Sequence, residues 1–427
     1  MTQLLIENLG EIATPRGTTP LRGAEQGRVA RIPRGEVLCR NGKIVFVGGR
    51  AERLSRYGEV RAEERFDAKG GTLIPGLVDC HTHLPWAGSR EGELGERLAG
   101  KSYQEIAAAG GGILATVAAT RQASEEELVD LVRARLDRML AWGTTTAEAK
   151  SGYGLSLADE LKQLRAIRRA AEAHPIDLVA TLLAAHEVPP EHRGERRRYL
   201  DLVCSEITPA AAEAGLARFT DVFCEQGVFT VEESRRVLEA GLACGLTPRL
   251  HADEFADSGG AALAAELAAA SADHLIAVSD SGIEALARSG VMAVLLPGVS
   301  FFLMQGAWAP ARRLVEAGVA VALATDSNPG SSHGESLPFV FWLGVFQLRL
   351  SIEEALVAIT LNPACCLGLG AEIGSIEQGK RADLVLLEAP NLLHLAYHFG
   401  VNPVAAVWKG GLPARPAPRG QPAAPPS

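Results

Sequence analysis

The sequence predicts an α/β protein with a (β/α)8 barrel of the TIM type and a smaller β-sandwich domain built from both chain ends. Between residues 75 and 365, eight short apolar stretches alternate with helix-length segments that are charged or Ala-rich, which is typical of βα units around a parallel sheet. Strand-like stretches with turn signals lie at both ends of the chain. The 427 residues, 47% of them apolar, are enough to bury one large core and one small core.

Residues 1–74 have the pattern of the first part of the small domain. The alternating stretches QLLIENL and GEVLCRNGKIVFVGG include Asn41-Gly42, a dipeptide typical of two-residue hairpin turns. Residues 366–412 supply similar strands, KRADLVLLEA and PVAAVWKGG, so we expect the two ends to pair in one domain. Residues 413–427 are rich in Pro, Ala and Gly, and this composition cannot build a packed core. We expect this tail to be disordered.

Residues 75–365 are expected to form the barrel. The segment SEEELVDLVRARLDRMLAWG carries apolar residues at helical spacing, and Ser124 followed by Glu127 at its start is a capping-box pattern. In such barrels the chemistry lies at the carboxyl ends of the strands. The eight candidate strands lie within 72–84, 144–152, 177–187, 220–227, 246–254, 271–275, 291–298 and 319–328.

Charge and composition argue against several classes of function. The formal net charge is −9, and no Lys- or Arg-rich run is interleaved with aromatics, so we expect no nucleic-acid partner. No stretch approaches the roughly 20 apolar residues of a membrane helix, and the first ten residues lack the pattern of a signal peptide. The seven cysteines form no CxxC pair, so a disulfide scaffold is not expected. These features favour a cytoplasmic protein without a membrane partner.

The strongest local signal is His81-Thr82-His83, which follows the apolar stretch 73–78. Residues two apart in a strand share a face, so two imidazoles would converge, and neutral imidazole is a good Zn²⁺ ligand. Alone, the pattern fits surface or capping histidines equally well. His251 and Asp326 also follow apolar strands, a costly placement for ionisable groups without partners. Three histidines and one carboxylate can enclose a cation and leave a position for water, although Asp326 alone would more often be a helix cap.

These motifs resemble the amidohydrolase superfamily. PGLVDCHTHL, a later HADE and a closing ATDSNPG are typical of it. GSREGELGERLAGKSYQEIAAAGGGI, GTTTAEAKSGYGL, LAAHEVPPE, HADEF, ADHL and NPGSS resemble the imidazolonepropionase family within it. The matching motifs run in order from Pro75 to about Ser332. The GGGI, AEAKSGYGL and HADEF blocks are specific to that family, whereas HxH and a strand-end Asp are shared across the superfamily.

The resemblance implies one divalent or trivalent metal ion per subunit, Zn²⁺ or iron. The implied ligands are His81, His83, His251 and Asp326. Two-metal relatives often use a carboxylated lysine on the fourth strand, but the matching segment 220–227 contains no lysine, which favours a single metal. Lys150 and Glu225 stay open as bridging ligands, although a structural salt bridge is the more ordinary role of each.

The resemblance also implies a reaction, the hydrolysis of the cyclic amide C–N bond of 4-imidazolone-5-propanoate to N-formimidoyl-L-glutamate in histidine degradation. Asp326 would move the proton, and His274 would orient the water and stabilise the oxyanion. Glu254, as a further catalytic group, would contact the ring nitrogens, and Arg90 would bind the propionate with its fork-shaped guanidinium. The other implied substrate-binding residues are Tyr153, His186, Asn328, Gly330 and Ser331.

Plainer interpretations stand beside these roles. Arg90 could be a surface arginine, Tyr153 a packing residue, His186 a turn cap and Glu254 an acid in the first turn of a helix. The nearest rival function is another cyclic amidohydrolase or an aromatic deaminase, and a rival of another class is a metal-binding scaffold without turnover. The expected partner is a small anionic cyclic amide. The Ala-rich helices are compatible with a homodimer face, but such stripes are more often core.

Overall fold

The structure is a computed structural model that describes residues 2–61, 64–101, 105–106 and 109–415. Eight strands form its centre: β8 (Leu77–Asp79), β9 (Thr144–Lys150), β10 (Asp177–Ala185), β11 (Phe219–Cys224), β12 (Thr247–Ala252), β13 (Ser271–His274), β14 (Met292–Leu295) and β15 (Val321–Leu323). They are hydrogen-bonded in chain order, and every neighbouring pair is parallel. All eight predicted strands are present, so the predicted (β/α)8 barrel is confirmed.

The barrel closes where its first and last strands end. Thr82 and Ser327 form an isolated parallel bridge. The backbone N–H of Asp326 donates to the carbonyl of His81, and the N–H of His83 donates to the carbonyl of Ser327, both at 3.0 Å. The predicted ligands on either side of this seam are therefore held together by main-chain hydrogen bonds.

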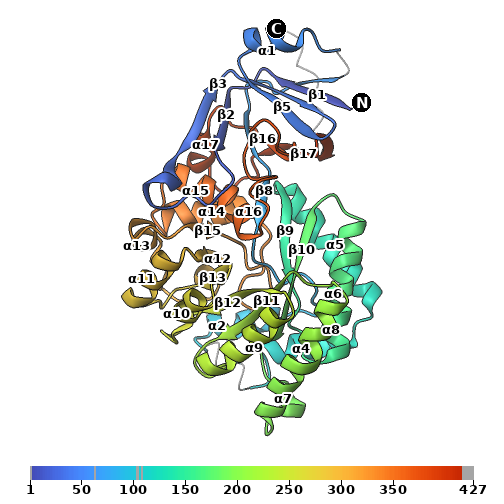
Figure 1. Cartoon of the computed structure of the whole chain (residues 1–427), viewed down its shortest axis with the longest axis vertical. Coiled ribbons are helices and arrows are strands. Elements are labelled where there is room, and N and C mark those ends of the chain that lie inside the picture. The colour runs from blue at the N-terminus through green and yellow to red at the C-terminus, as the bar shows by residue number, and fades with distance from the viewer. Residues whose placement is uncertain (1, 62–63, 102–104, 107–108, 416–427) are drawn as a thin grey trace.

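Helices cover the outside of the barrel (Figure 1). The first long helix, α5, begins with the predicted capping box, in which the side chains of Ser124 and Glu127 each accept from the other's backbone N–H. The helices beside the barrel are α2 (Glu91–Leu98), α4 (Ile113–Gln122), α5 (Glu125–Ala141), α6 (Leu157–Glu172), α7 (Arg196–Leu202), α8 (Thr208–Glu213), α9 (Val231–Ala243), α10 (Gly260–Glu266), α11 (Asp280–Ser289), α12 (Pro297–Phe302), α13 (Ala311–Glu316), α14 (Leu337–Phe346), α15 (Ile352–Ala358) and α16 (Leu361–Cys366).

Two further sheets lie at one end of the long axis, where blue and red strands meet in Figure 1. One is built from β1 (Gln3–Glu7), β4 (Glu36–Arg40), β5 (Lys43–Gly48) and β6 (Arg65–Asp67). The other is built from β2 (Glu11–Pro15), β3 (Val29–Pro33), β7 (Thr72–Pro75), β16 (Leu384–Leu387), β17 (Val404–Lys409) and β18 (Leu412–Arg415). The helices α1 (Arg50–Tyr57) and α17 (Leu392–Tyr397) belong to the same chain ends.

The two chain ends share the second of these sheets, as the sequence predicts. Strand β7 pairs with β2 on one side and with β16 on the other. In the predicted hairpin between β4 and β5, Asn41 and Gly42 both have positive φ, at 48° and 79°, which is the geometry of a type I′ turn. The first residues of the predicted tail, from Pro413, lie in β18, and 416–427 lie outside the described residues.

Two further findings bear on the chain as a whole. None of the helices in the described ranges has the length and apolar character needed to cross a membrane. All seven cysteines are free thiols.

Candidate active site

Most of the predicted site residues line one cavity at the carboxyl ends of the barrel strands. His81 is fully buried beside Asp326, which lines the cavity, and Gly330 lies against Arg90. Three apolar residues that sequence reasoning did not single out also line the cavity: Ile113, Phe223 and Phe255. The predicted residues that line it are His83, Arg90, Tyr153, His186, His251, Glu254, His274, Asp326, Asn328 and Ser331.

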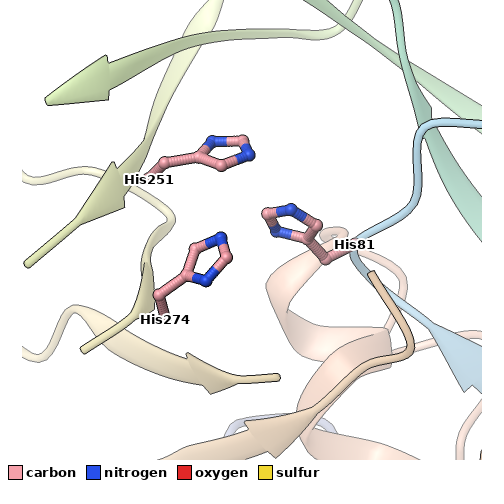
Figure 2. A group of neighbouring side chains, drawn as sticks. All are labelled: His81, His251 and His274. Carbon is pink, nitrogen blue, oxygen red and sulfur yellow. The ribbon is translucent and has the colours of Figure 1, made fainter. Parts of the chain in front are cut away.

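The four predicted metal ligands come together at the floor of this cavity. The Nε2 atoms of His81 and His83 lie 3.3 and 3.2 Å from Oδ1 of Asp326, and Nε2 of His251 lies 3.4 Å from Nε2 of His83. His274 joins the cluster, because one ligand atom each from His81, His251 and His274 lie within 4.8 Å of one another. Figure 2 shows these three rings turned toward one another, His251 from β12, His274 from β13 and His81 from the segment after β8.

The chemistry of the cluster fits a metal ion. Within the described chain, Nε2 of His81, Oδ1 of Asp326 and both ring nitrogens of His274 are buried and have no hydrogen-bond partner. Burying such atoms is costly unless a ligand satisfies them. Three imidazole nitrogens and one carboxylate oxygen are donors that suit Zn²⁺ or iron. This donor set, in a chain with the motifs described above, indicates a metal centre.

Two buried carboxylates orient two of the predicted ligand histidines. Nδ1 of His81 lies 2.6 Å from Oδ2 of Asp273, and Nδ1 of His251 lies 3.2 Å from Oδ1 of Asp221. A carboxylate that takes the Nδ1 proton fixes the tautomer and turns Nε2 toward the metal position. Sequence reasoning missed both aspartates, although each lies on a predicted strand.

Lys150 and Glu225 have structural partners. Nζ of Lys150 lies 2.8 Å from both Glu148 and Asp221, inside the barrel, where all three side chains are fully buried. Although burial lowers it, these carboxylates raise the pKa of Lys150 overall, so the ammonium is charged. The carboxylate of Glu225 accepts from the backbone N–H of Glu254 at 2.8 Å. Both residues support the site from outside the ligand cluster.

The residues after β15 aim the Asp326 carboxylate. Asp326 has a φ of +50°, and His274 has a φ of +78°, a strained conformation that persists only where surrounding contacts enforce it. Nδ2 of Asn328 donates to Oδ2 of Asp326 at 3.0 Å, which leaves Oδ1 toward the histidines. The N–H groups of Gly330 and Ser331 both donate to Oδ1 of Asn328 at 2.8 Å. The predicted product-binding turn is thus held by its own hydrogen bonds.

The middle of the cavity is aromatic and neutral. The ring centroids of Tyr153 and His186 are 5.4 Å apart. Nδ1 of His186 donates to the carbonyl of Gly152 at 3.0 Å, so its Nε2 carries the lone pair. Burial lowers the pKa of His186 well below its usual value, and the ring is neutral. Burial, together with Asp326 and Glu225, raises the pKa of Glu254 well above its usual value.

Two of the plainer interpretations do not describe the structure. Glu254 is not a helix acid, because Asp253 instead accepts the backbone N–H groups of Gly260 and Ala261 at the start of α10. Arg90 is not a surface residue, because only 8% of it is exposed. Its Nε and Nη2 donate to the two carboxylate oxygens of Glu93 at 3.0 and 2.8 Å.

Comparison with known proteins identifies the family. The model of the amidohydrolase family matches residues 72–413. The chain is 53% identical over 410 residues to the imidazolonepropionase of Symbiobacterium thermophilum, covering 96% of each chain. It is 50% identical over 414 residues to that of Geobacillus kaustophilus, covering 96% of this chain and 97% of the relative. This chain belongs to the imidazolonepropionase family. The prediction of a hydrolase of this family is thereby confirmed.

Solved structures of more distant proteins share the fold of this imidazolonepropionase family member. Guanine deaminase of E. coli superposes with a TM-score of 0.70 at 16% identity, covering 96% of this chain and 99% of that one. An adenosine deaminase of Xanthomonas campestris with bound zinc superposes with a TM-score of 0.68 at 22% identity, covering 96% and 92%. At these identities the likeness shows the barrel architecture alone.

Proposed function

We propose that the cavity at the barrel mouth is where this chain hydrolyses the cyclic amide C–N bond of 4-imidazolone-5-propanoate, giving N-formimidoyl-L-glutamate in histidine degradation. The observation that carries this proposal is the combination of a metal-binding cluster and a buried arginine fork in one cavity. The chain also shares 53% of its residues with an imidazolonepropionase over 96% of its length. A deaminase of the same fold would have no need of Arg90 for an anionic side chain.

Different side chains of the cavity bind different parts of the substrate. Arg90 binds the propionate carboxylate, for which a guanidinium offers two parallel N–H donors. The rings of Tyr153 and His186 contact the imidazolone ring, and the lone pair on Nε2 of His186 accepts from a ring N–H. Glu254, whose pKa is raised well above its usual value by burial and by the charges of Asp326 and Glu225, contacts the ring nitrogens. Asn328, Gly330 and Ser331 border the end of the site at which the ring-opened product forms.

We propose that His81, His83, His251 and Asp326 hold one Zn²⁺ or iron ion. When bound, this ion supplies Lewis acidity and lowers the pKa of a coordinated water from about 15.7 to roughly 7. Asp326 accepts the proton of the attacking water and returns it to the ring nitrogen that leaves as the C–N bond breaks. His274, kept neutral because burial lowers its pKa, orients the water and stabilises the oxyanion.

We further propose that the protein acts in the cytoplasm on a small anionic cyclic amide, without nucleic-acid or membrane partners. The net charge of −9 argues against an electrostatic partnership with nucleic acid. A homodimer stays our prediction for the assembly, and light scattering during size-exclusion chromatography measures its mass directly.

The test is turnover of 4-imidazolone-5-propanoate, followed by ultraviolet absorbance, on protein of measured metal content. We expect His81→Ala to lose the metal and to lower kcat/KM at least about 10³-fold, because the metal stabilises the transition state by several kcal/mol. His333→Ala is the matched control, since His333 is exposed and lies outside the cluster. Ammonia release would favour a deaminase, and bound metal without turnover would favour a scaffold.

A further inference from the structure

One face of helix α2 carries three charged residues, of which Arg90 lines the cavity. Arg90 is the N-cap of this helix, and Glu93 and Arg97 follow it by three and seven residues, a spacing that places side chains on the same helical face. All three side chains are buried or nearly so. Such burial of charge requires that the groups satisfy one another.

Glu93 fixes the orientation of the Arg90 guanidinium. Its carboxylate accepts from Nε and Nη2 of Arg90, so one edge of the fork is committed to this pair. Oε1 of Glu93 also accepts from the backbone N–H of Gly112 at 2.9 Å. A Cβ on Gly111 would lie 3.0 Å from that same oxygen. The absence of side chains at Gly111 and Gly112 therefore lets the backbone before α4 approach the Glu93 carboxylate.

Gly330 fixes where the other edge of the fork lies. A Cβ built on Gly330 would lie 1.9 Å from Nη1 of Arg90, so the guanidinium occupies the space that any side chain there would take. The carbonyl of Gly330 accepts from Nη1 of Arg97 at 2.7 Å. Helix α2 and the turn after β15 are thus joined across the cavity wall at this glycine.

The charges of this group leave one positive unit at the cavity. Although burial raises it, the hydrogen bonds of Arg90 and Gly112 and the charge of Arg97 lower the pKa of Glu93 overall, so its carboxylate is ionised. The single negative charge of Glu93 offsets half of the positive charge of Arg90 and Arg97. An anion at the cavity side of Arg90 therefore meets the attraction of this group at short range.

We propose that Glu93, Arg97, Gly111 and Gly330 form a carboxylate cradle that fixes the Arg90 fork and thereby makes the enzyme select substrates with an anionic side chain. Glu93, Arg97 and Gly330 are positioning residues that act through Arg90. This inference rests on the proposed function and deepens it, because it assigns the selectivity for the propionate to a preorganised group rather than to Arg90 alone.

A pair of glycine substitutions tests the cradle. Gly330→Ala drives a methyl group into the Arg90 guanidinium, whereas Gly334→Ala, four residues on, meets no atom within 4 Å. Each variant is assayed with 4-imidazolone-5-propanoate and with its propanamide analogue, which keeps the ring and removes the charge. We expect Gly330→Ala to raise KM for the propanoate about 10- to 100-fold, the loss of a charge-assisted contact. We expect KM for the propanamide to rise at least about fivefold less than KM for the propanoate in Gly330→Ala. Both KM values of Gly334→Ala should change less than about twofold.

Glu93→Asp is the second variant, because it keeps the charge and withdraws the carboxylate from the two-point contact with Arg90. We expect the same selective rise in KM, and no rise in Glu91→Asp, an exposed acid on the same helix. Equal losses on both substrates in Gly330→Ala or Glu93→Asp would overturn the cradle. Calorimetric binding of imidazole-4-propanoate against its methyl ester gives the same comparison without turnover. If the wild type hydrolyses neither the propanoate nor the propanamide, the proposed function is wrong. The calorimetric comparison still tests the cradle in that case.

Discussion

At the scale of single residues, the proposed ligand histidines His81 and His251 each contact a buried carboxylate through Nδ1. Asp221 contacts Nδ1 of His251 and Nζ of Lys150 at once. We predict that Asp221→Asn weakens metal binding about 10- to 100-fold, because the amide cannot supply the negative charge that makes the imidazole a strong ligand. Metal retained after dialysis against graded chelator concentrations measures this. Asp137→Asn, beside His174 on the surface, should retain metal like the wild type, and equal retention by Asp221→Asn would contradict the prediction.

The site residues that could be predicted from the sequence differ from the missed ones in the strength of their sequence signal. His81, His83, His251 and Asp326 stand out because they interrupt apolar strands at the carboxyl end. The supporting carboxylates of Asp221 and Asp273 have a weaker sequence signal. Asp221, Phe223 and Glu225 alternate along β11 and its end, so they share the interior face, but a single acid at the start of a strand is also compatible with an exposed position. Only the pairing of neighbouring strands shows which imidazole each acid reaches.

At the scale of elements, helix α6 holds the loop that carries Tyr153. The buried carboxylate of Glu160 accepts from the backbone N–H groups of Gly152, Gly154 and Leu155. In Glu160→Gln one of these donors faces an amide NH2, so we predict a loss of about 1–3 kcal/mol in the free energy of unfolding and a raised KM. Urea denaturation and steady-state kinetics measure the two effects. Glu172→Gln, at the exposed end of the same helix, should change neither quantity.

The elements of the barrel were predictable because each strand is an apolar run bounded by turn signals and each long helix has apolar periodicity. The capping box of α5 and the hairpin of Asn41-Gly42 follow from local chemistry and were predicted at the correct residues. The face of α2 that carries Arg90, Glu93 and Arg97 was not predicted. Its charged residues have helical spacing, but the same spacing is usual on a solvated helix, and only tertiary contact distinguishes the two.

At the scale of the whole molecule, the small sheets lie at one end of the long axis (Figure 1), and no described residue of their strands lines the cavity. Trp408 on β17 is 2% exposed and meets the Phe66 ring edge-on at 4.9 Å between centroids. We predict that Trp408→Ala lowers the free energy of unfolding by about 3–5 kcal/mol and changes kcat/KM less than about twofold. Chemical denaturation followed by circular dichroism tests the first part. Leu412→Ala, on an exposed side chain of β18, should cost less than about 0.5 kcal/mol.

The pairing of the two chain ends was predictable because strand-like stretches with turn signals lie at both ends of the chain. The order of strands within that sheet was not, because β7 takes β2 on one side and β16 on the other, and several alternating runs have equivalent patterns. The choice between zinc and iron also lies beyond the sequence, since three imidazoles and a carboxylate suit both ions.

The bridge between Thr82 and Ser327 means that the two segments that close the barrel also carry three of the four proposed metal ligands. His81 and His83 lie on one side of that junction, and Asp326 lies on the other. The ion that we propose at this site would therefore bind both segments and stabilise the closure of the barrel. A chain in which β8 and β15 have separated has an incomplete set of these ligands. Loss of the ion and opening of the barrel would then occur together.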